Sequence, residues 1–311
     1  MKGTGMSIVL RILVAAAIVQ AAPSLGAEVV WAQALHPQWS PTGAWIAYYE
    51  RTGDSASIYI VRPDGSGRER LTTGPDYDAN PTWGPGGHEL AFARGVGGMR
   101  ETWDIIVLDV GSGRETRLTH TSEREVHTTW SPDGTRIAFV VLSEDGSDIF
   151  MVNRDGSGLR RLTDTVEREF HPKWSPDSRS LIYDSGPDDQ RQIWTLDVET
   201  GESRQLVRLD PGRSASAPAW SPDGALLTFS SKRGGDPNPV WFLRVDGPGG
   251  EAFHIEGVEG APVWSPDGEW IAFTHSPDDG EEDESSDDRR GWIAPDAITT
   301  TLDEERFDGR V

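Results

Sequence analysis

The stretch that decides the fold is Trp130-Ser131-Pro132-Asp133-Gly134, followed directly by the apolar alternation Arg136-Ile137-Ala138-Phe139-Val140. Related stretches occur six times along the chain, at intervals of 44 to 47 residues. Their tryptophans are Trp39, Trp83, Trp130, Trp174, Trp220 and Trp264. A period of this size and regularity is typical of a repeat protein in which each copy is one supersecondary unit.

The residues after each tryptophan favour a tight turn. Proline presets φ at the second position of a type I turn, aspartate suits the third, and glycine takes the left-handed conformation that returns the chain. The tryptophan therefore stands where one strand ends, shortly before the next begins. We expect the six indoles to be core residues that pack between neighbouring sheets, and not ligand platforms.

Further β patterns complete each copy. A run of branched and aromatic residues follows, as in Ile149-Phe150-Met151-Val152, and then comes a Gly-containing turn. Several copies end on a short strand such as Arg161-Leu162-Thr163. Four strands in each of six copies predict an all-β fold, a six-bladed β-propeller of four-stranded blades. We assign residues 28–311 to this single domain.

The amino terminus is typical of a secretory signal peptide. Lys2 and Arg11 precede the short apolar run from Ile12 to Val19, and small residues lead up to Ala27. The run is shorter than the roughly 20 residues that a bilayer span needs, which disfavours an uncleaved anchor. We therefore predict that residues 1–27 are a signal peptide. The mature protein is expected to be exported, periplasmic or extracellular, monomeric and without a stable membrane span.

Composition excludes several classes of function. The formal net charge of −22 argues against nucleic acid as a partner, because phosphate would be repelled. The chain has no cysteine, so disulfides, zinc–thiolate sites and a thiol nucleophile are all excluded.

The Trp-Ser-Pro-Asp-Gly core, the Ile-Ala-Phe strand, the Asp-Gly hairpin and the Arg-Leu-Thr ending resemble the WD-like repeats of the TolB family. These repeats form the six-bladed propeller of the periplasmic protein TolB, so the resemblance implies a propeller and export. Two departures restrict it. We expect no counterpart of the α/β domain that precedes the TolB propeller, because only a few residues separate Ala27 from His36. The repeats also resemble those in the propeller domains of prolyl oligopeptidase relatives. The Gly-x-Ser-x-Gly nucleophile elbow of those enzymes does not occur in this sequence.

Polar residues recur at two offsets before the repeat tryptophans. Three residues back stand His36, Asn80, His127 and His171, and five residues back stand Asp78, Glu125 and Glu169. In a propeller this segment is the innermost strand of each blade, so equivalent positions form a ring around the central channel. Odd offsets share one side of a strand. We predict that these seven residues line one mouth of the channel and bind a ligand.

A divalent metal is one possible ligand. His36, His127 and His171 would suit zinc, manganese or iron by ligand type, provided that their nitrogens converge on one point. No other cofactor is implied. Alternatively, an imidazole at this position only hydrogen-bonds the backbone of a neighbouring blade.

The last copy departs from the others. It carries an acidic insertion, residues 277–290, which we expect to be solvated and dispensable for folding, or else a contact for cations or a basic partner. Its blade lacks an outer strand, because Pro295 cannot donate to a ladder. We expect the segment Glu28–Ala32 to supply this strand and close the ring.

Three functions are compatible with these features. The first is a non-catalytic exported propeller that binds a protein or another cell-envelope ligand at its top face or channel mouth. The second is a metal-dependent lyase or hydrolase that acts on polysaccharide through the channel ring. The third is a structural module of an envelope assembly.

Overall fold

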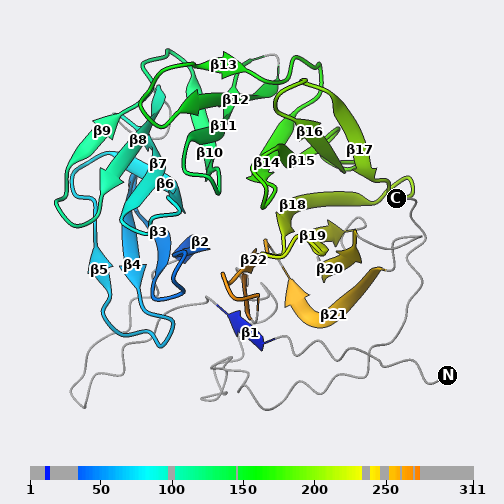
Figure 1. Cartoon of the computed structure of the whole chain (residues 1–311), viewed down its shortest axis with the longest axis horizontal. Coiled ribbons are helices and arrows are strands. Elements are labelled where there is room, and N and C mark those ends of the chain that lie inside the picture. Colours follow the sequence, from blue (N-terminus) through cyan, green and yellow to red (C-terminus); the bar gives the residue numbers. More distant parts are fainter. Residues whose placement is uncertain are drawn as a thin grey trace.

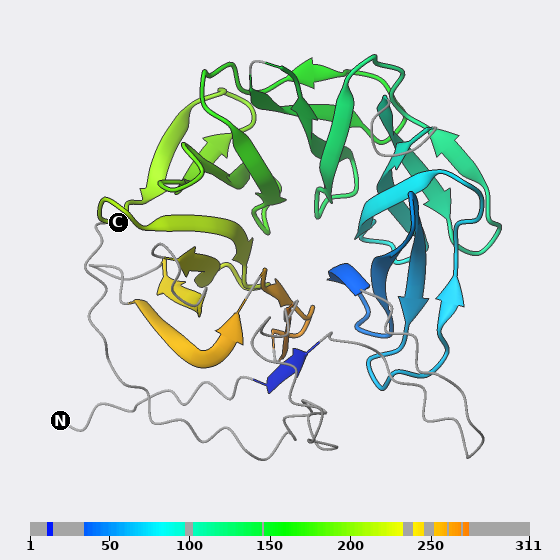
Figure 2. The same ribbon diagram turned by 180° about the vertical axis from the view of Figure 1, so that it is seen from behind.

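In the computed structural model of the chain, the described residues are 11–14, 34–96, 102–144, 146–232, 239–245, 252–259, 261–268 and 270–273. Every regular element among them is a β-strand, which confirms the all-β prediction. The two opposite views in Figures 1 and 2 show that the sheets follow one another around a common axis. None of the described segments forms a helix with the length and hydrophobicity that a membrane crossing requires.

The strands group into six units, and the first strand of each ends at a repeat tryptophan. Unit one contains β2 (Ala34–Trp39), β3 (Ile46–Thr52), β4 (Ser55–Val61) and β5 (Glu69–Arg70). Unit two contains β6 (Tyr77–Trp83), β7 (Glu89–Gly95), β8 (Trp103–Asp109) and β9 (Glu115–Arg117). Unit three contains β10 (Arg124–Trp130), β11 (Arg136–Leu142), β12 (Ser147–Asn153) and β13 (Arg160–Arg161). Unit four contains β14 (Glu169–Trp174), β15 (Ser180–Ser185), β16 (Gln192–Asp197) and β17 (Ser203–Val207). Unit five contains β18 (Ser214–Trp220), β19 (Leu226–Lys232), β20 (Pro239–Arg244) and β21 (Ala252–Glu259). Unit six contains β22 (Val263–Trp264) and β23 (Trp270–Phe273).

Consecutive strands within a unit pair antiparallel. In units one to three, a parallel bridge joins the third strand of one unit to the first strand of the next, as between Ala56 and Tyr77 and between Trp103 and Arg124. These bridges merge the three units into one 12-stranded sheet, while units four and five are separate four-stranded sheets. The first strand of every unit is its innermost one (Figure 1), and this placement brings the predicted site residues together.

The turn after each tryptophan has the predicted structure. In unit three the Gly134 amide donates to the Ser131 carbonyl at 2.9 Å, and Gly134 has a φ of 76°. Asp133 accepts hydrogen bonds from the Ser131 hydroxyl at 2.6 Å and from the Thr135 amide at 2.9 Å. Glycine is needed here because other residues enter the left-handed region only at a cost.

The repeat tryptophans pack between units. Trp83, Trp130, Trp174 and Trp264 are buried, which confirms the core prediction for them. Trp39 and Trp220 are partly buried. The indole of Trp174 also donates to the Thr129 carbonyl of the preceding unit at 3.2 Å. Burying an indole stabilises the fold by a few kcal/mol on area grounds, so each tryptophan fixes its unit against a neighbour.

The last unit contains a strand from the other end of the chain. The strand β1 (Arg11–Val14) pairs parallel with β23, and β22 completes this three-stranded sheet. The strand β2 contacts β22 and β23, so the first and last units adjoin. The segment Glu28–Ala32 and the acidic insertion 277–290 lie outside the described residues, and the signal peptide stays a prediction.

Candidate functional site

A β-bulge interrupts the first strand of units one to five, three residues before the tryptophan. Five non-glycine residues have positive φ there: His36 (51°), Asn80 (53°), His127 (55°), His171 (51°) and Ala217 (51°). In unit three, Val126 pairs with Val140 and Thr129 with Ala138, so that two residues face Phe139 alone. Asn and His enter the left-handed region more readily than most residues. The bulge therefore gives a backbone reason for finding them at this offset.

The bulges surround a pocket of about 50 Å³ among the innermost strands. The residues three before each tryptophan all line it: His36, Asn80, His127, His171, Ala217 and Ala261. The structure thus brings together the three imidazoles and the amide that the repeat spacing predicted. The prolines or threonine that follow them, with Gln38, Lys173 and Val263, complete the lining, which contains no carboxylate.

The imidazoles lie next to one another. The ring centroids of His36 and His127 are 5.9 Å apart, and those of His127 and His171 are 4.5 Å apart. Asn80 links two units, because its side-chain oxygen accepts from the His127 amide at 3.4 Å and its carbonyl accepts from the Thr128 hydroxyl at 2.5 Å. Both bonds join two units, but neither is made by an imidazole ring. The alternative interpretation, in which an imidazole bonds the backbone of a neighbouring blade, stays a prediction.

Burial sets the charge state of two of the three imidazoles. It lowers the pKa of His36 to about 4, with a smaller contribution from repulsion by His171. Burial also lowers the pKa of His127 well below its ordinary value. Both imidazoles are therefore neutral at pH 7 and can each donate one hydrogen bond and accept another.

The three predicted carboxylates do not line this pocket. Glu125 is buried and accepts hydrogen bonds from Thr119 and, at 2.9 Å, from Thr121. Glu169 accepts in the same way from Thr163 and, at 3.0 Å, from Thr165. Asp78 pairs with Arg94 at 2.6 Å. The left-handed residue interrupts the two-residue alternation of the strand, so offsets of three and five do not share a side as the sequence pattern implied.

Asp184 supports the ring and was not among the predicted residues. Its carboxylate is fully buried, and its Oδ1 lies 2.7 Å from His171 Nδ1. The same oxygen accepts from the Ala217 amide at 3.2 Å, and its Oδ2 accepts from Arg191 at 3.2 Å. A sequence signal for it exists, because the equivalent strand positions in units one, two, three and five hold no charged residue: Tyr49, Ala93, Val140 and Ser230.

Lys173 is the second residue that the spacing did not single out. It follows the His171-Pro172 pair and lines both the ring pocket and a neighbouring pocket of about 220 Å³. Five of the repeat tryptophans also line that second pocket. Burial lowers the pKa of Lys173 to about 8. None of the ion pairs between described residues involves this ammonium group.

The ring residues do not fit a metal ion. Within the described ranges, no group of three or more His, Asp or Glu side chains is arranged so that it could hold one. The rings of His36, His127 and His171 are neighbours, but a site for zinc needs three nitrogens within about 2.1 Å of a single point. The arrangement suits hydrogen bonding and the binding of an anion instead, through Lys173 and the imidazole and amide groups.

Two curated relatives each match about three fifths of the chain. An uncharacterized protein of Agrobacterium fabrum is 30% identical over 202 residues, which cover 61% of this chain and 67% of that protein. A TolB homolog of Chlorobium luteolum is 30% identical over 188 residues, covering 60% of this chain and 42% of that protein. The chain therefore spans less than half the length of the Chlorobium relative.

Solved structures show the same fold. TolB from Acinetobacter baumannii superposes with a TM-score of 0.64 at 18% identity, over 75% of this chain and 58% of that chain. An oligogalacturonate lyase in complex with manganese superposes with a TM-score of 0.57 at 12% identity, over 74% of this chain and 67% of that chain. At these identities the likeness concerns the fold alone. The sequence model of the TolB beta propeller domain matches residues 31–248, and the chain therefore belongs to the TolB β-propeller domain family.

Proposed function

We propose that the chain is an exported, non-catalytic β-propeller of six four-stranded blades that binds a protein or another cell-envelope ligand at the mouth of its central channel. The ligand places a carboxylate or another anionic group between Lys173 and the imidazoles. Five units of four consecutive strands, a shorter sixth unit and the contact of β2 with β22 support the blade count. The TolB relatives support an envelope role.

The observation that carries the proposal is the charge of the pocket in this chain. Acidic residues outnumber basic ones by 51 to 29, yet the pocket lining contains three imidazoles, two amides and an ammonium group, and no carboxylate. Lys173 is one of only three lysines, and it is half-buried without an acidic partner among the described residues. A charge that is partly removed from water without a partner is costly, and an anionic ligand would offset that cost.

Asp184 fixes the orientation of one imidazole of the pocket. With its carboxylate ionised, it accepts the Nδ1 proton of His171, which leaves Nε2 as the atom available to a ligand. Arg191 and the Ala217 amide hold the other lone pairs of the carboxylate. Asp184 is therefore a positioning residue that orients His171 before a ligand arrives.

Catalysis by a metal-dependent lyase or hydrolase is the alternative that the histidines of the ring predicted. It would require the imidazoles to hold a metal ion, and the described side chains do not form a group that could. Ligand binding uses the same residues without this requirement. We therefore favour binding.

The test is capture of an envelope partner by the purified protein. We expect the wild type to retain a specific partner that the variant Lys173→Gln loses. Lys232→Gln is the matched control, because Lys232 is exposed at the end of β19 and the change in net charge is the same. The partner is then purified and its dissociation constant measured for the three proteins. Equal affinities for wild type and Lys173→Gln would overturn the proposal.

A further inference from the structure

An arginine of the outer strand recurs in units one to three and contacts the third strand. Arg161 donates to Asp148 at 2.7 Å, and Arg117 pairs with Asp104 at 2.5 Å. In unit one Arg70 donates to the Ser57 hydroxyl at 2.7 Å. In each case the arginine pairs across the ladder with a large apolar or aromatic residue of the third strand, and its partner stands two residues before that residue.

Unit four lacks this arrangement. Gln205 occupies the place of the arginine, opposite Trp194, and Gln192 stands two residues before Trp194. The two glutamines do not bond to each other. Gln205 Nε2 donates to the Val207 carbonyl at 3.3 Å, while Gln192 Oε1 accepts from the Leu209 amide at 2.6 Å. The connection from β17 to β18 runs from residue 208 to residue 213 and supplies Leu209.

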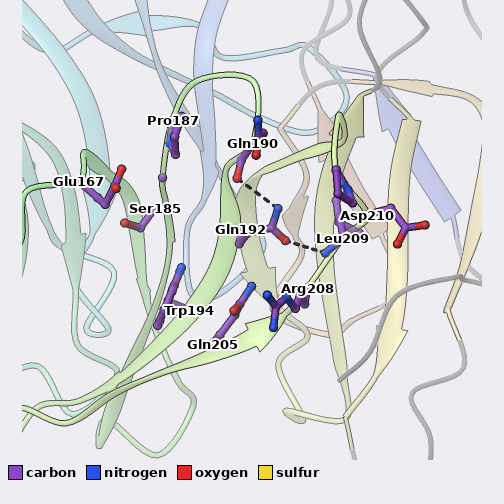
Figure 3. A pocket seen from close by; sticks show the side chains of 12 residues that line it. Glu167, Ser185, Pro187, Gln190, Gln192, Trp194, Gln205, Arg208, Leu209 and Asp210 are labelled. Carbon is purple, nitrogen blue, oxygen red and sulfur yellow. Dashed lines mark hydrogen bonds between the residues drawn. The ribbon is translucent and has the colours of Figure 1, made fainter.

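A groove of about 590 Å³ opens where units one to three have the arginine pair. Figure 3 shows Glu167 and Ser185 on one side, Arg208 and Asp210 on the other, and the two glutamines between them. Trp194 lines the groove and also packs against the apolar cluster between units three and four. Unit four thus has a polar groove with an aromatic residue in its wall where units two and three have an ion pair.

We propose that this groove binds a neutral oligosaccharide. Gln192 Nε2 also donates to the Gln190 carbonyl at 3.1 Å, so each glutamine amide keeps a second N–H and an oxygen lone pair beyond its bonds within the chain. These groups match the hydroxyl groups of a sugar, and an indole offers an apolar surface to the face of a sugar ring. Glu167 and Asp210 against Arg208 give no excess of positive charge to select an anion. The volume lies within the roughly 300–1,000 Å³ of small-ligand pockets.

The side chains of β16 and β17 line the groove, and this favours a sugar over an extended peptide. A peptide that added to a sheet would need the unpaired backbone of the outer strand. Trp194 and Gln192 lie on β16, an inner strand whose backbone pairs with β15 and β17.

The experiment uses the full chain and three neutral tetrasaccharides, made of β-1,4-linked glucose, α-1,4-linked glucose and β-1,4-linked N-acetylglucosamine, in isothermal titration calorimetry. We expect at least one to bind. The double variant Gln192→Asp/Gln205→Arg copies the Asp148–Arg161 pair into unit four and should weaken that binding by at least about tenfold, or 1.4 kcal/mol. Trp194→Phe, which copies Phe150, should weaken it by a smaller factor.

Two control variants test whether the sugar binds in this groove and nowhere else on the propeller. Asp148→Gln/Arg161→Gln puts the glutamines into unit three without Trp194 or the connection 208–213, and should leave binding unchanged. Lys173→Gln should also leave it unchanged, so the channel and the groove fail or succeed independently. The inference is overturned if no tetrasaccharide binds at millimolar concentration, if the double variant binds as well as the wild type, or if an uncharged pentapeptide competes as effectively as the sugar.

Discussion

Ala217 shares the left-handed backbone of the ring residues but has no polar side chain to make use of it. An alanine with a φ of 51° destabilises the folded state by about 1 kcal/mol. Glycine avoids this cost, but it also increases the conformational entropy of the unfolded chain, which offsets part of the gain in stability. We expect Ala217→Gly to raise the free energy of unfolding by about 0.5 kcal/mol in urea titrations. Ala219→Gly, in the same strand but outside the left-handed region, should lower it. A loss of equal size in both variants would contradict the bulge strain.

Glu125 makes the stability of the fold depend on pH. Burial raises its pKa to about 7, so the folded chain binds more protons than the unfolded chain between roughly pH 4.5 and 7. The stability contribution of this group is complete below about pH 4.5 and is lost as the pH rises through 7. Glu125→Gln should therefore gain roughly 1–3 kcal/mol relative to the wild type between pH 5 and pH 8.

Urea titrations of both proteins at pH 5 and pH 8 measure this difference. Subtracting the wild type removes the opposite contribution of His36, whose lowered pKa destabilises the fold as the pH falls below about 6.5. If the difference in free energy of unfolding between the two proteins is the same at pH 5 and pH 8, the pKa of the Glu125 carboxyl is not raised by folding.

At the scale of the strand, the outer-strand arginines differ in how deeply their aspartate partners are buried. Arg117 pairs with Asp104, whose side chain is 2% exposed, whereas Arg161 pairs with Asp148, whose side chain is 15% exposed. Arg117→Ala leaves a carboxylate buried without its partner and should cost about 2 kcal/mol. Arg161→Ala should cost less than about 1 kcal/mol. Equal losses in thermal or urea unfolding would mean that burial of the aspartate does not matter.

The sequence predicted the strands and turns well, because alternation and turn residues act locally. It could not predict the bulge before each tryptophan, because a histidine in the left-handed conformation does not change the apolar and polar alternation that indicates a strand. The prediction that His36, His127 and His171 lie together did not depend on the bulge, because they occupy the same position in their units. Glu125 and Glu169 did not join it, because their place depended on strict alternation. Asp184 could have been found because it is charged where the equivalent position of the second strand holds Tyr49, Ala93, Val140 or Ser230.

At the scale of the molecule, export is a testable expectation. Expression in a cell with a secretory pathway should yield a mature chain that begins at Glu28, and intact-mass measurement of the envelope fraction decides this. The strand β1 would then be absent from the mature protein, and unit six would need another strand beside β23. A chain that retains Arg11–Val14 in its final compartment would contradict the signal peptide and would make β1 part of the ring.

The ligand is less accessible to sequence reasoning than the fold. Six similar repeats specify a core, and a feature common to all of them carries no information about a ligand. Information lies where single repeats deviate, as at Lys173, Asp184 and the glutamine pair of unit four. The acidic surface of the chain does not identify the channel ligand either, because it repels the anion that the pocket suits.

The most direct test of the central claim compares two labelled, end-blocked pentapeptides, Gly-Ser-Glu-Gly-Ser and Gly-Ser-Gln-Gly-Ser, by fluorescence anisotropy at low salt. The wild type should bind the glutamate peptide at least about tenfold more tightly at pH 7, equivalent to 1.4 kcal/mol. This preference should fall as the pH rises through about 8, where Lys173 loses its charge. Lys173→Gln should abolish it and Lys232→Gln should keep it. Equal affinity of the wild type for the two peptides, or a preference that persists in Lys173→Gln, would contradict an anion site in the channel.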